Sequence, residues 1–129
     1  MSAKIIIVED DLAISQMYRI KFEADGYEVK TAANGKLGLK LVEEMKPDII
    51  LLDLMMPEMT GSDMLAELRK NLWAKNIKVI VLTNVSQDEA LLSLNNQPID
   101  GFIIKAQYTP SQVVEIVKET LTQKPIVKS

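Results

Sequence analysis

The stretch Ile49-Ile50-Leu51-Leu52-Asp53-Leu54 begins with four apolar residues and then places a carboxylate directly behind them. Similar, largely apolar runs stand at Ile5–Val8 and Ile77–Leu82. Short runs of this kind are typical of strands that are buried on both faces, as in a parallel sheet. Tyr27–Ala32 alternates polar and apolar side chains, which favours an edge strand, and Gly101–Ile104 is a weaker fifth run. The sequence therefore predicts a five-stranded sheet.

Longer stretches with helical spacing separate these runs, and each carries an apolar stripe. Glycine and proline end the first two stretches, at Gly26 and Pro47. The alternation predicts an α/β fold, a doubly wound parallel sheet with right-handed crossovers and helices on both faces. The stripes predicted to face the core are Ala13, Met17, Ile20 and Ala24; Leu37, Leu41 and Met45, flanked by Gly38 and Val42; Met64, Leu65, Leu68 and Leu72; Ala90, Leu91 and Leu94; and Val113, Ile116, Val117 and Leu121.

Four of the predicted helices begin at a residue that can cap the first turn. A Ser, Thr or Asn side chain in that place accepts a hydrogen bond from a main-chain N–H that the helix leaves unpaired. A glutamate or glutamine three residues further on can complete a reciprocal pair of bonds. The predicted caps are Asn34, Ser62, Ser86 with Glu89, and Thr109 with Pro110 and Gln112.

Composition limits the classes of function that the chain can have. Its 129 residues suit a single domain, and its net charge of -3 argues against a nucleic-acid-binding surface. Cys and His are absent, which excludes disulfides, thiolate metal sites and histidine catalysis. No apolar run approaches the roughly 20 residues of a membrane span, and the N-terminus lacks the layout of a signal peptide. We expect one soluble, cytoplasmic domain over residues 1–129, with its core at 4–122 and a polar tail at 123–129.

Polar residues gather where the predicted strands end. In an open α/β sheet, ligands bind at the carboxyl ends of the strands. Clustered carboxylates repel one another unless a cation joins them, and oxygen ligands with open positions favour Mg²⁺. A lysine and a hydroxyl beside such an ion would bind an anion, which indicates a phosphoryl site with an Asp as nucleophile. The residues are Glu9, Asp10 and Asp11 after the first strand, Asp53 after the third, Thr83 and Asn84 after the fourth, and Lys105 after the fifth.

Four motifs in this order carry a family resemblance: VEDD at Val8–Asp11, LLDLMMPEMTG at Leu51–Gly61, VLT at Val81–Thr83 and GFIIK at Gly101–Lys105. Over residues 4–122 the chain resembles the response-regulator receiver domain of bacterial two-component signalling, of the chemotaxis-receiver type. Any one motif is weakly specific, but all four at these spacings are highly specific. The resemblance implies a flavodoxin-like five-stranded sheet, strand order 2-1-3-4-5, with five helices.

The resemblance also implies the role of each site residue. Asp53 would accept a phosphoryl group from a sensor histidine kinase or a phosphotransfer protein. The chain would then be a signalling domain rather than an enzyme, although it would promote its own phosphotransfer and slowly remove its own phosphoryl group. The expected Mg²⁺ ligands are Glu9, Asp10, Asp53 and the main-chain carbonyl of Met55; the expected phosphoryl contacts are Thr83 and Lys105; the expected switch pair is Thr83 and Phe102.

The expected output is an effect on a downstream protein that the sequence does not name. The resemblance places the responding surface on the helix around Ala90, the strand Gly101–Ile104 and the helix around Val113. We expect a stand-alone switch with no direct contact to nucleic acid or membrane. The last helix lacks the arginines that form the dimer interface of the family's transcription factors, so we expect a monomer or a weak dimer.

Two positions depart from the family pattern and leave an alternative open. Ala106 stands where proline usually follows the lysine, and Asn84 stands where a small residue usually follows the threonine. A degenerate receiver that binds partners without phosphorylation is therefore the second hypothesis. A hydrolase with an Asp nucleophile would need a DxD motif where Glu9–Asp11 stands, and a flavin-binding relative would have its phosphate repelled by the acids. Asp11 itself is expected to cap a helix rather than bind metal.

Overall fold

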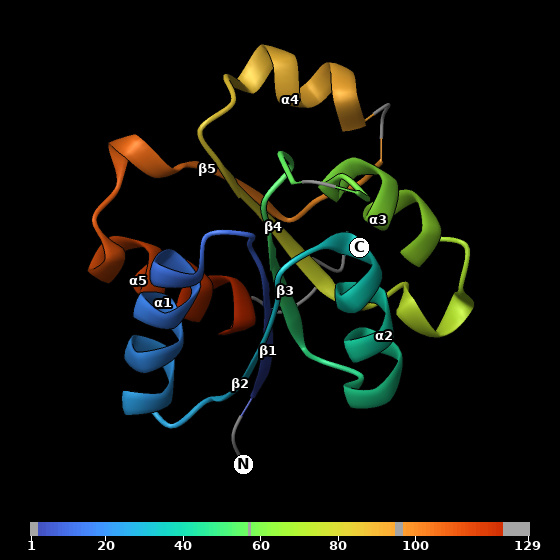
Figure 1. The fold of residues 1–129 in the computed structure, drawn as a ribbon. Coiled ribbons are helices and arrows are strands. Elements are labelled where there is room, and N and C mark those ends of the chain that lie inside the picture. Colours follow the sequence, from blue (N-terminus) through green and yellow to red (C-terminus); the bar gives the residue numbers. More distant parts are fainter. Residues whose placement is uncertain (1–2, 57, 95–96, 123–129) are drawn as a thin grey trace, which may run out of the picture.

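The computed structural model describes residues 3–56, 58–94 and 97–122, and only the main chain of Leu91. It contains a five-stranded parallel sheet in the order β2-β1-β3-β4-β5, which confirms the predicted α/β fold and strand order (Figure 1). The elements are β1 (Lys4–Val8), α1 (Leu12–Ala24), β2 (Glu28–Ala32), α2 (Gly35–Met45), β3 (Ile49–Leu52), α3 (Gly61–Leu68), β4 (Lys78–Thr83), α4 (Gln87–Leu94), β5 (Gly101–Ile104) and α5 (Pro110–Thr122), with short 3-10 helices at Leu72–Ala74 and Lys105–Gln107.

The strands bring distant parts of the chain together at their carboxyl ends. β3 is buried at every position, whereas β2 exposes alternate residues as an edge strand does. Val8 at the end of β1 is the register partner of Leu52 at the end of β3. Because the two strands are parallel and end together, the residues that follow them, Glu9 and Asp53, leave the sheet side by side.

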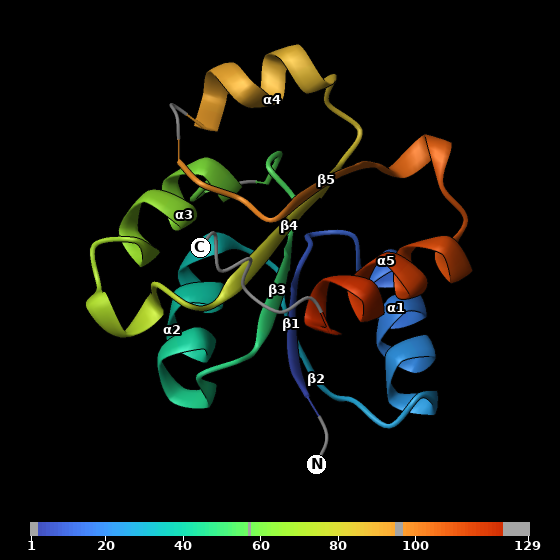
Figure 2. The ribbon, with the colours of Figure 1, turned by 180° about the vertical axis from the view of Figure 1, so that it is seen from behind.

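Helices cover both faces of the sheet, and each face has its own apolar core. α1 and α5 pack beside each other on one face, while α2 and α3 cover the other (Figures 1 and 2). The first core includes Phe22 from α1 and Val117 from α5. The second includes Val42 from α2 and Leu65 from α3, and α4 adds Leu94 to it. Burial on both faces explains why the central strands are apolar at nearly every position.

The stripe predicted for α1 is wrong. The helix instead buries Ser15, Tyr18 and Phe22, and the Phe22 ring packs edge to face on Tyr27 with 5.9 Å between the ring centroids. Two aromatic rings one helical turn apart offer more apolar area than a stripe in which two of four residues are alanines. The four residues that were predicted to face the core and are exposed are Ala13, Met17, Ile20 and Ala24.

Among the side chains that the structure describes, the stripes of the other helices are confirmed with two exceptions. Leu37 in α2 is 48% exposed, and Leu72 lies outside α3 and is 80% exposed. The chain leaves the α3 axis because the guanidinium group of Arg69 donates hydrogen bonds to the carbonyl oxygens of Ala74 and Ile77, at 3.0 and 3.1 Å. These bonds hold the chain in a turn after α3, so Leu72 does not continue the buried face of that helix.

One of the predicted helix caps is also wrong. α3 begins two residues earlier than expected, because the hydroxyl of Thr60 accepts a hydrogen bond from the N–H of Asp63 at 3.1 Å. The Ser62 hydroxyl instead donates to the hydroxyl of Ser93 at 3.1 Å and so joins α3 to α4. The confirmed caps are Asn34, Ser86 and Thr109, each of which accepts from the N–H three residues further on.

Two predictions fall outside the described residues: the polar tail at 123–129 and the side chain of Leu91 in the α4 stripe. Among the helices that the structure describes, none has both the length and the hydropathy needed to cross a membrane.

The corrected face of α1 can be tested with two alanine variants of the same helix. Phe22→Ala removes a ring that is 0% exposed and should lower the free energy of unfolding by about 3–5 kcal/mol. Ile20→Ala, the matched control at a residue 63% exposed, should change it by less than about 0.5 kcal/mol. Urea denaturation followed by circular dichroism measures both. A larger loss for Ile20→Ala than for Phe22→Ala would contradict the observed packing.

Candidate functional site

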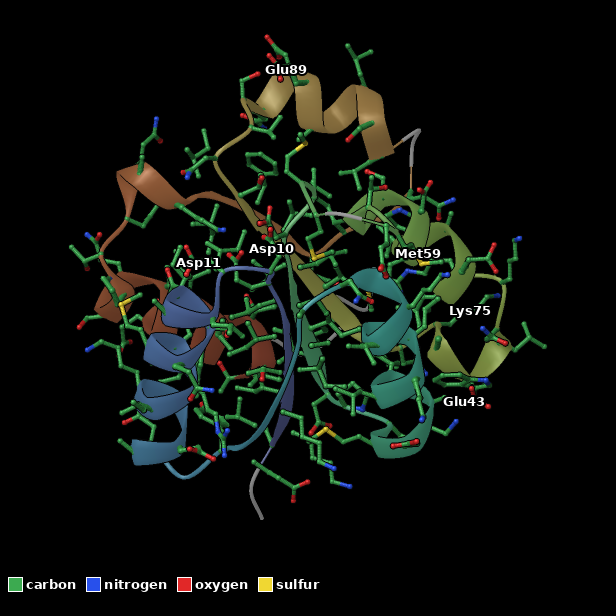
Figure 3. All side chains as sticks on the ribbon, in the orientation of Figure 1. Asp10, Asp11, Glu43, Met59, Lys75 and Glu89 are labelled. Carbon is green, nitrogen blue, oxygen red and sulfur yellow. The ribbon has the colours of Figure 1, made fainter. Side chains whose placement is uncertain are left out.

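Three carboxylates meet at the carboxyl edge of the sheet. Possible ligand atoms of Glu9, Asp10 and Asp53 all lie within 4.8 Å of one another. Glu9 and Asp53 are 4% and 6% exposed, whereas Asp10 faces solvent. Figure 3 shows Asp10 at the end of the sheet, with Asp11 at the start of α1. The donor set is made of hard oxygen atoms, which suits a divalent cation such as Mg²⁺ or Ca²⁺. The predicted acids are therefore brought together in an arrangement that could hold a metal ion.

The ammonium group of Lys105 lies among these acids. It donates hydrogen bonds to Oε1 of Glu9 and to Oδ2 of Asp53, the second at 3.1 Å. Lys105 follows β5 directly and begins a short 3-10 helix, so its backbone is placed by the sheet. One buried cation thus compensates two buried anions drawn from β1 and β3, as desolvated charges require.

Burial and pairing together shift the pKa values of both partners. Burial raises the pKa of Glu9, and the hydrogen bond from Lys105 offsets only part of that rise. Burial lowers the pKa of Lys105, but the hydrogen bond to Glu9 and the charge of Asp53 outweigh it, so the pKa is raised overall. The lysine is therefore held in its cationic form, ready to pair with an anion.

Asp53 is oriented by the main chain as well as by Lys105. Its N–H donates to the carbonyl oxygen of Val8 at 3.0 Å, which continues the β1–β3 pairing by one residue. Its Oδ1 accepts a hydrogen bond from the N–H of Met55 at 3.1 Å. Each carboxylate oxygen of Asp53 thus has a partner. The Met55 side chain is 65% exposed, and the proposed role of its carbonyl oxygen as a metal ligand stays a prediction.

A glycine lets the chain that follows Asp53 return close to it. A Cβ atom at Gly61 would collide with the carbonyl oxygen of Asp53 and would lie 2.9 Å from Cα of Leu54. The N–H of Gly61 donates to the carbonyl oxygen of Leu54 at 3.2 Å. The start of α3 therefore packs directly on the segment that carries the acid, and only glycine fits there.

The hydroxyl and aromatic side chains come from the neighbouring strands β4 and β5. Thr83 ends β4 and is fully buried, and its Oγ1 accepts a hydrogen bond from the N–H of Val85 at 3.3 Å. Phe102 in β5 is the register partner of Val81, two residues before Thr83. Residues two apart on a strand share a face, so Thr83 and Phe102 face the same side of the sheet. Phe102 is half-buried against the core on that side.

Two hydrogen bonds around the site were not foreseen from the sequence. Asp11 caps α1 as expected, by accepting from the N–H of Ile14 at 3.1 Å, but its own N–H also donates to Oε2 of Glu9 at 3.1 Å. The side-chain oxygen of Asn84 accepts from the N–H of Ala106 at 3.1 Å. Both residues of that second bond stand out as departures from the family pattern, and this coincidence was the available signal that they interact.

Comparison with known proteins agrees with this fold. The family model described as the response regulator receiver domain matches residues 5–118. The chain belongs to the response regulator receiver family. It is 32% identical over 120 residues to the chemotaxis protein CheY of Thermotoga maritima, covering 92% of this chain and 98% of that protein.

Other members of the family are longer. The chain is 33% identical over 102 residues to RpaA of Synechocystis sp., a DNA-binding dual master transcriptional regulator. That match covers 79% of this chain but only 42% of RpaA. Among solved structures, a CheY-like receiver domain protein from Methanospirillum hungatei superposes with a TM-score of 0.85 at 30% identity, covering 94% of each chain. The receiver is thus a unit shared by short and long relatives.

The close approach at Gly61 yields a prediction about the site. Gly61→Ala should lower the free energy of unfolding by about 1–3 kcal/mol, because the segment from Asp53 to Leu54 must move to admit the methyl group. It should also weaken Mg²⁺ binding, since that segment carries one of the acids. Gly101→Ala is the control, because its new Cβ would lie 3.4 Å from the nearest atom, Cγ1 of Ile80. Chemical denaturation and calorimetric titration with Mg²⁺ measure the two effects, and equal results for the two variants would contradict the prediction.

Proposed function

We propose that this receiver domain is a phosphorylation switch in which Asp53 accepts the phosphoryl group in a Mg²⁺-dependent reaction. The observation that carries the proposal is the surrounding of Asp53, a buried carboxylate flanked by two further acids and a buried ammonium group. A structural aspartate at the end of an apolar strand would not need two more acids beside it, because clustered like charges are costly.

The residues of the site divide the work of phosphoryl transfer. A carboxylate oxygen of Asp53 forms the new bond to phosphorus, while the bond from phosphorus to the donor nitrogen breaks and the donor keeps that electron pair. Lys105 supplies positive charge and hydrogen bonds to the transferred oxygens, with the Thr83 hydroxyl as a second donor. Mg²⁺, held by Glu9, Asp10, Asp53 and the carbonyl of Met55, would supply the charge that offsets repulsion between the acids and the incoming group.

The proposed phosphodonor is a sensor histidine kinase or a phosphotransfer protein. Such a donor must bring its phosphorylated side chain to Asp53 and therefore contact the surface around it. Leu12, directly after the acids, is 69% exposed, and Met17 and Ile20 are further exposed apolar side chains of α1. Apolar side chains left in solvent beside a reactive site are a suitable contact for a partner protein. The outer face of α1 is thus the side from which we expect the donor to approach.

The proposed output surface is formed by α4, β5 and α5. A phosphoryl group adds roughly 1.5 to 2 negative charges beside Lys105 and should draw Thr83 toward it, away from the N–H of Val85. Phe102, on the same face of the sheet, can then move into the space beside Thr83. α4 follows Thr83 closely in the chain and lies at the top of both views, above β4 and β5 (Figures 1 and 2). A change at Thr83 therefore reaches a surface that a downstream protein can contact.

Three finer expectations stay predictions. The first is that the chain acts as a stand-alone switch. The matched relatives do not decide this, because the chain covers 98% of CheY but only 42% of RpaA. The second is that it works in the cytoplasm as a monomer or weak dimer without contacting nucleic acid or membrane. The third is that phosphorylation operates the switch. The alternative, a receiver that binds partners without phosphorylation, is favoured by one observation, the bulk of Asn84 beside the site.

The central test is labelling by a small phosphodonor. Intact-mass spectrometry after incubation with phosphoramidate or acetyl phosphate should show one added phosphoryl group when Mg²⁺ is present and none with a chelator, because the acids repel the donor anion. Asp53→Asn is the matched control, since it keeps the shape but loses the nucleophilic carboxylate. Equal labelling of Asp53→Asn and the wild-type chain, or equal labelling with and without Mg²⁺, would reject the proposal. A wild-type chain that is never labelled would favour the phosphorylation-independent alternative.

A second prediction concerns how long the phosphoryl group persists. Hydrolysis needs a water in line with the phosphorus, opposite the Asp53 oxygen. We expect the residues two positions beyond Asp53 and two beyond Thr83 to flank the path of this water. They are Met55 and Val85, and neither side chain can hold a water by a strong hydrogen bond. We expect slow hydrolysis. Met55→Asn with Val85→Glu should lower the barrier by about 1–2 kcal/mol.

Loss of labelled phosphate from the purified protein at fixed Mg²⁺ measures this lifetime. The single variants serve as controls, since each adds one polar group to the path of the water. A wild-type lifetime of seconds that the double substitution leaves unchanged would show that water placement at these positions does not set the rate.

A further inference from the structure

We propose that Asn84 is a positioning residue whose hydrogen bond to the N–H of Ala106, here called the loop latch, couples the two groups that would bind the phosphoryl oxygens. The inference rests on the proposed function of Asp53. It deepens that function by naming a residue that controls how strongly the site holds a phosphoryl group.

The geometric basis is that each partner of the latch is the immediate neighbour of a site residue. Asn84 follows Thr83 at the end of β4, and Ala106 follows Lys105 at the end of β5. The side-chain oxygen of Asn84 accepts from the N–H of Ala106 at 3.1 Å, and Lys105 in turn contacts Asp53. The latch therefore joins the residue after Thr83 to the residue after Lys105, and Lys105 contacts the acid that would carry the phosphoryl group.

The two residues are also chemically matched to each other. A main-chain N–H exists at position 106 only because the residue there is not proline, since proline has no such donor. The acceptor at position 84 is the amide oxygen of the asparagine side chain, a group that alanine lacks. Proline at position 106 would leave the Asn84 oxygen without this donor, and alanine at position 84 would leave the N–H of Ala106 without this acceptor. The pair is therefore one feature of the molecule, even though the two residues are 22 positions apart.

The latch acts before any phosphoryl group arrives. β4 and β5 are paired only up to Thr83 and Ile104, and the latch adds a direct hydrogen bond between the two segments that follow. Holding the loops together restricts the positions that Lys105 and Thr83 can occupy relative to each other. Binding of a phosphoryl group must fix both groups, and a site that is already ordered loses less conformational entropy when it binds. The latch should therefore increase the affinity of the site for a phosphoryl mimic.

The magnitude is limited by solvent. Both Asn84 and Ala106 are exposed, and a neutral hydrogen bond in that setting contributes less than a buried one. We therefore expect removal of the latch to weaken binding of beryllofluoride, measured with Mg²⁺ in excess, by about two- to fivefold.

A double-mutant cycle separates the latch from other effects of each substitution. The four proteins are the wild-type chain, Asn84→Ala, Ala106→Pro and the double variant. Ala106→Pro removes the N–H but also restricts the main chain, and the cycle cancels that second effect because it is present in both Pro-containing proteins. Asn84→Ala should weaken beryllofluoride binding in the wild-type background and have no effect in the Ala106→Pro background. Equal effects in both backgrounds, or no effect in either, would overturn the proposal.

Two further measurements identify the cause. Ala106→Ser keeps the N–H, and Gln107→Ala changes an exposed residue of the same short helix, so both should retain wild-type affinity for beryllofluoride; a loss as large as that of Asn84→Ala in either would overturn the proposal. The exchange of the Ala106 amide hydrogen, measured by NMR without any phosphoryl mimic, should be faster in Asn84→Ala than in the wild-type chain. Unchanged exchange would show that the latch is absent in solution.

The outcomes also separate this inference from the proposed function. If the wild-type chain binds no beryllofluoride and Asp53 is not phosphorylated, the proposed function fails and the positioning role fails with it, whatever the exchange shows. If the wild-type chain binds beryllofluoride and the cycle shows no coupling, only the latch fails.

Discussion

The burial of two carboxylates beside each other is the constraint on which the site depends. Glu9 and Asp53 are placed side by side because β1 and β3 are parallel neighbours that end in register. Two buried carboxylates at the carboxyl end of the sheet are unfavourable unless a cation compensates their negative charge. Lys105 meets that requirement from a third strand, β5, with hydrogen bonds to both acids. The acids and the lysine are thus not separate features, because the lysine compensates the burial of the two acids and the acids compensate the burial of the lysine.

The same constraint explains why the surrounding loops are so closely fitted. Asp53 stays in place because the N–H of Met55 binds its carboxylate and the N–H of Asp53 continues the sheet. Gly61 then brings α3 back onto the Asp53 segment at a distance that no side chain allows. The second oxygen of Glu9 is bound by the N–H of Asp11, which in turn caps α1. Helix beginnings and acid positions are therefore coupled, and a change in one loop is transmitted to the site through the main chain.

Some features could be predicted from local sequence because the physics behind them is local. Asn34 and Thr109 cap helices through bonds to residues three positions away, so the pattern contains all the information needed. The face of α1 could not be found in this way. Spacing predicted one stripe, whereas the structure buries Tyr18 and Phe22 against the sheet and α5 instead. Likewise, Leu72 has the spacing of α3 but lies in a turn that the side chain of Arg69 holds by bonds to Ala74 and Ile77.

By itself the sequence determined the α/β class, the strands and the polar residues that follow them, because apolar runs and strand-end polar residues depend on short stretches of chain. The family resemblance added the strand order. The contacts among these groups were decided only by the tertiary structure. Lys105 and Glu9 are separated by 96 positions, and whether they meet depends on the register of β1, β3, β4 and β5 together. The bond between Asn84 and Ala106 arises for the same reason, since two loops can pair only after the sheet has brought their strands side by side.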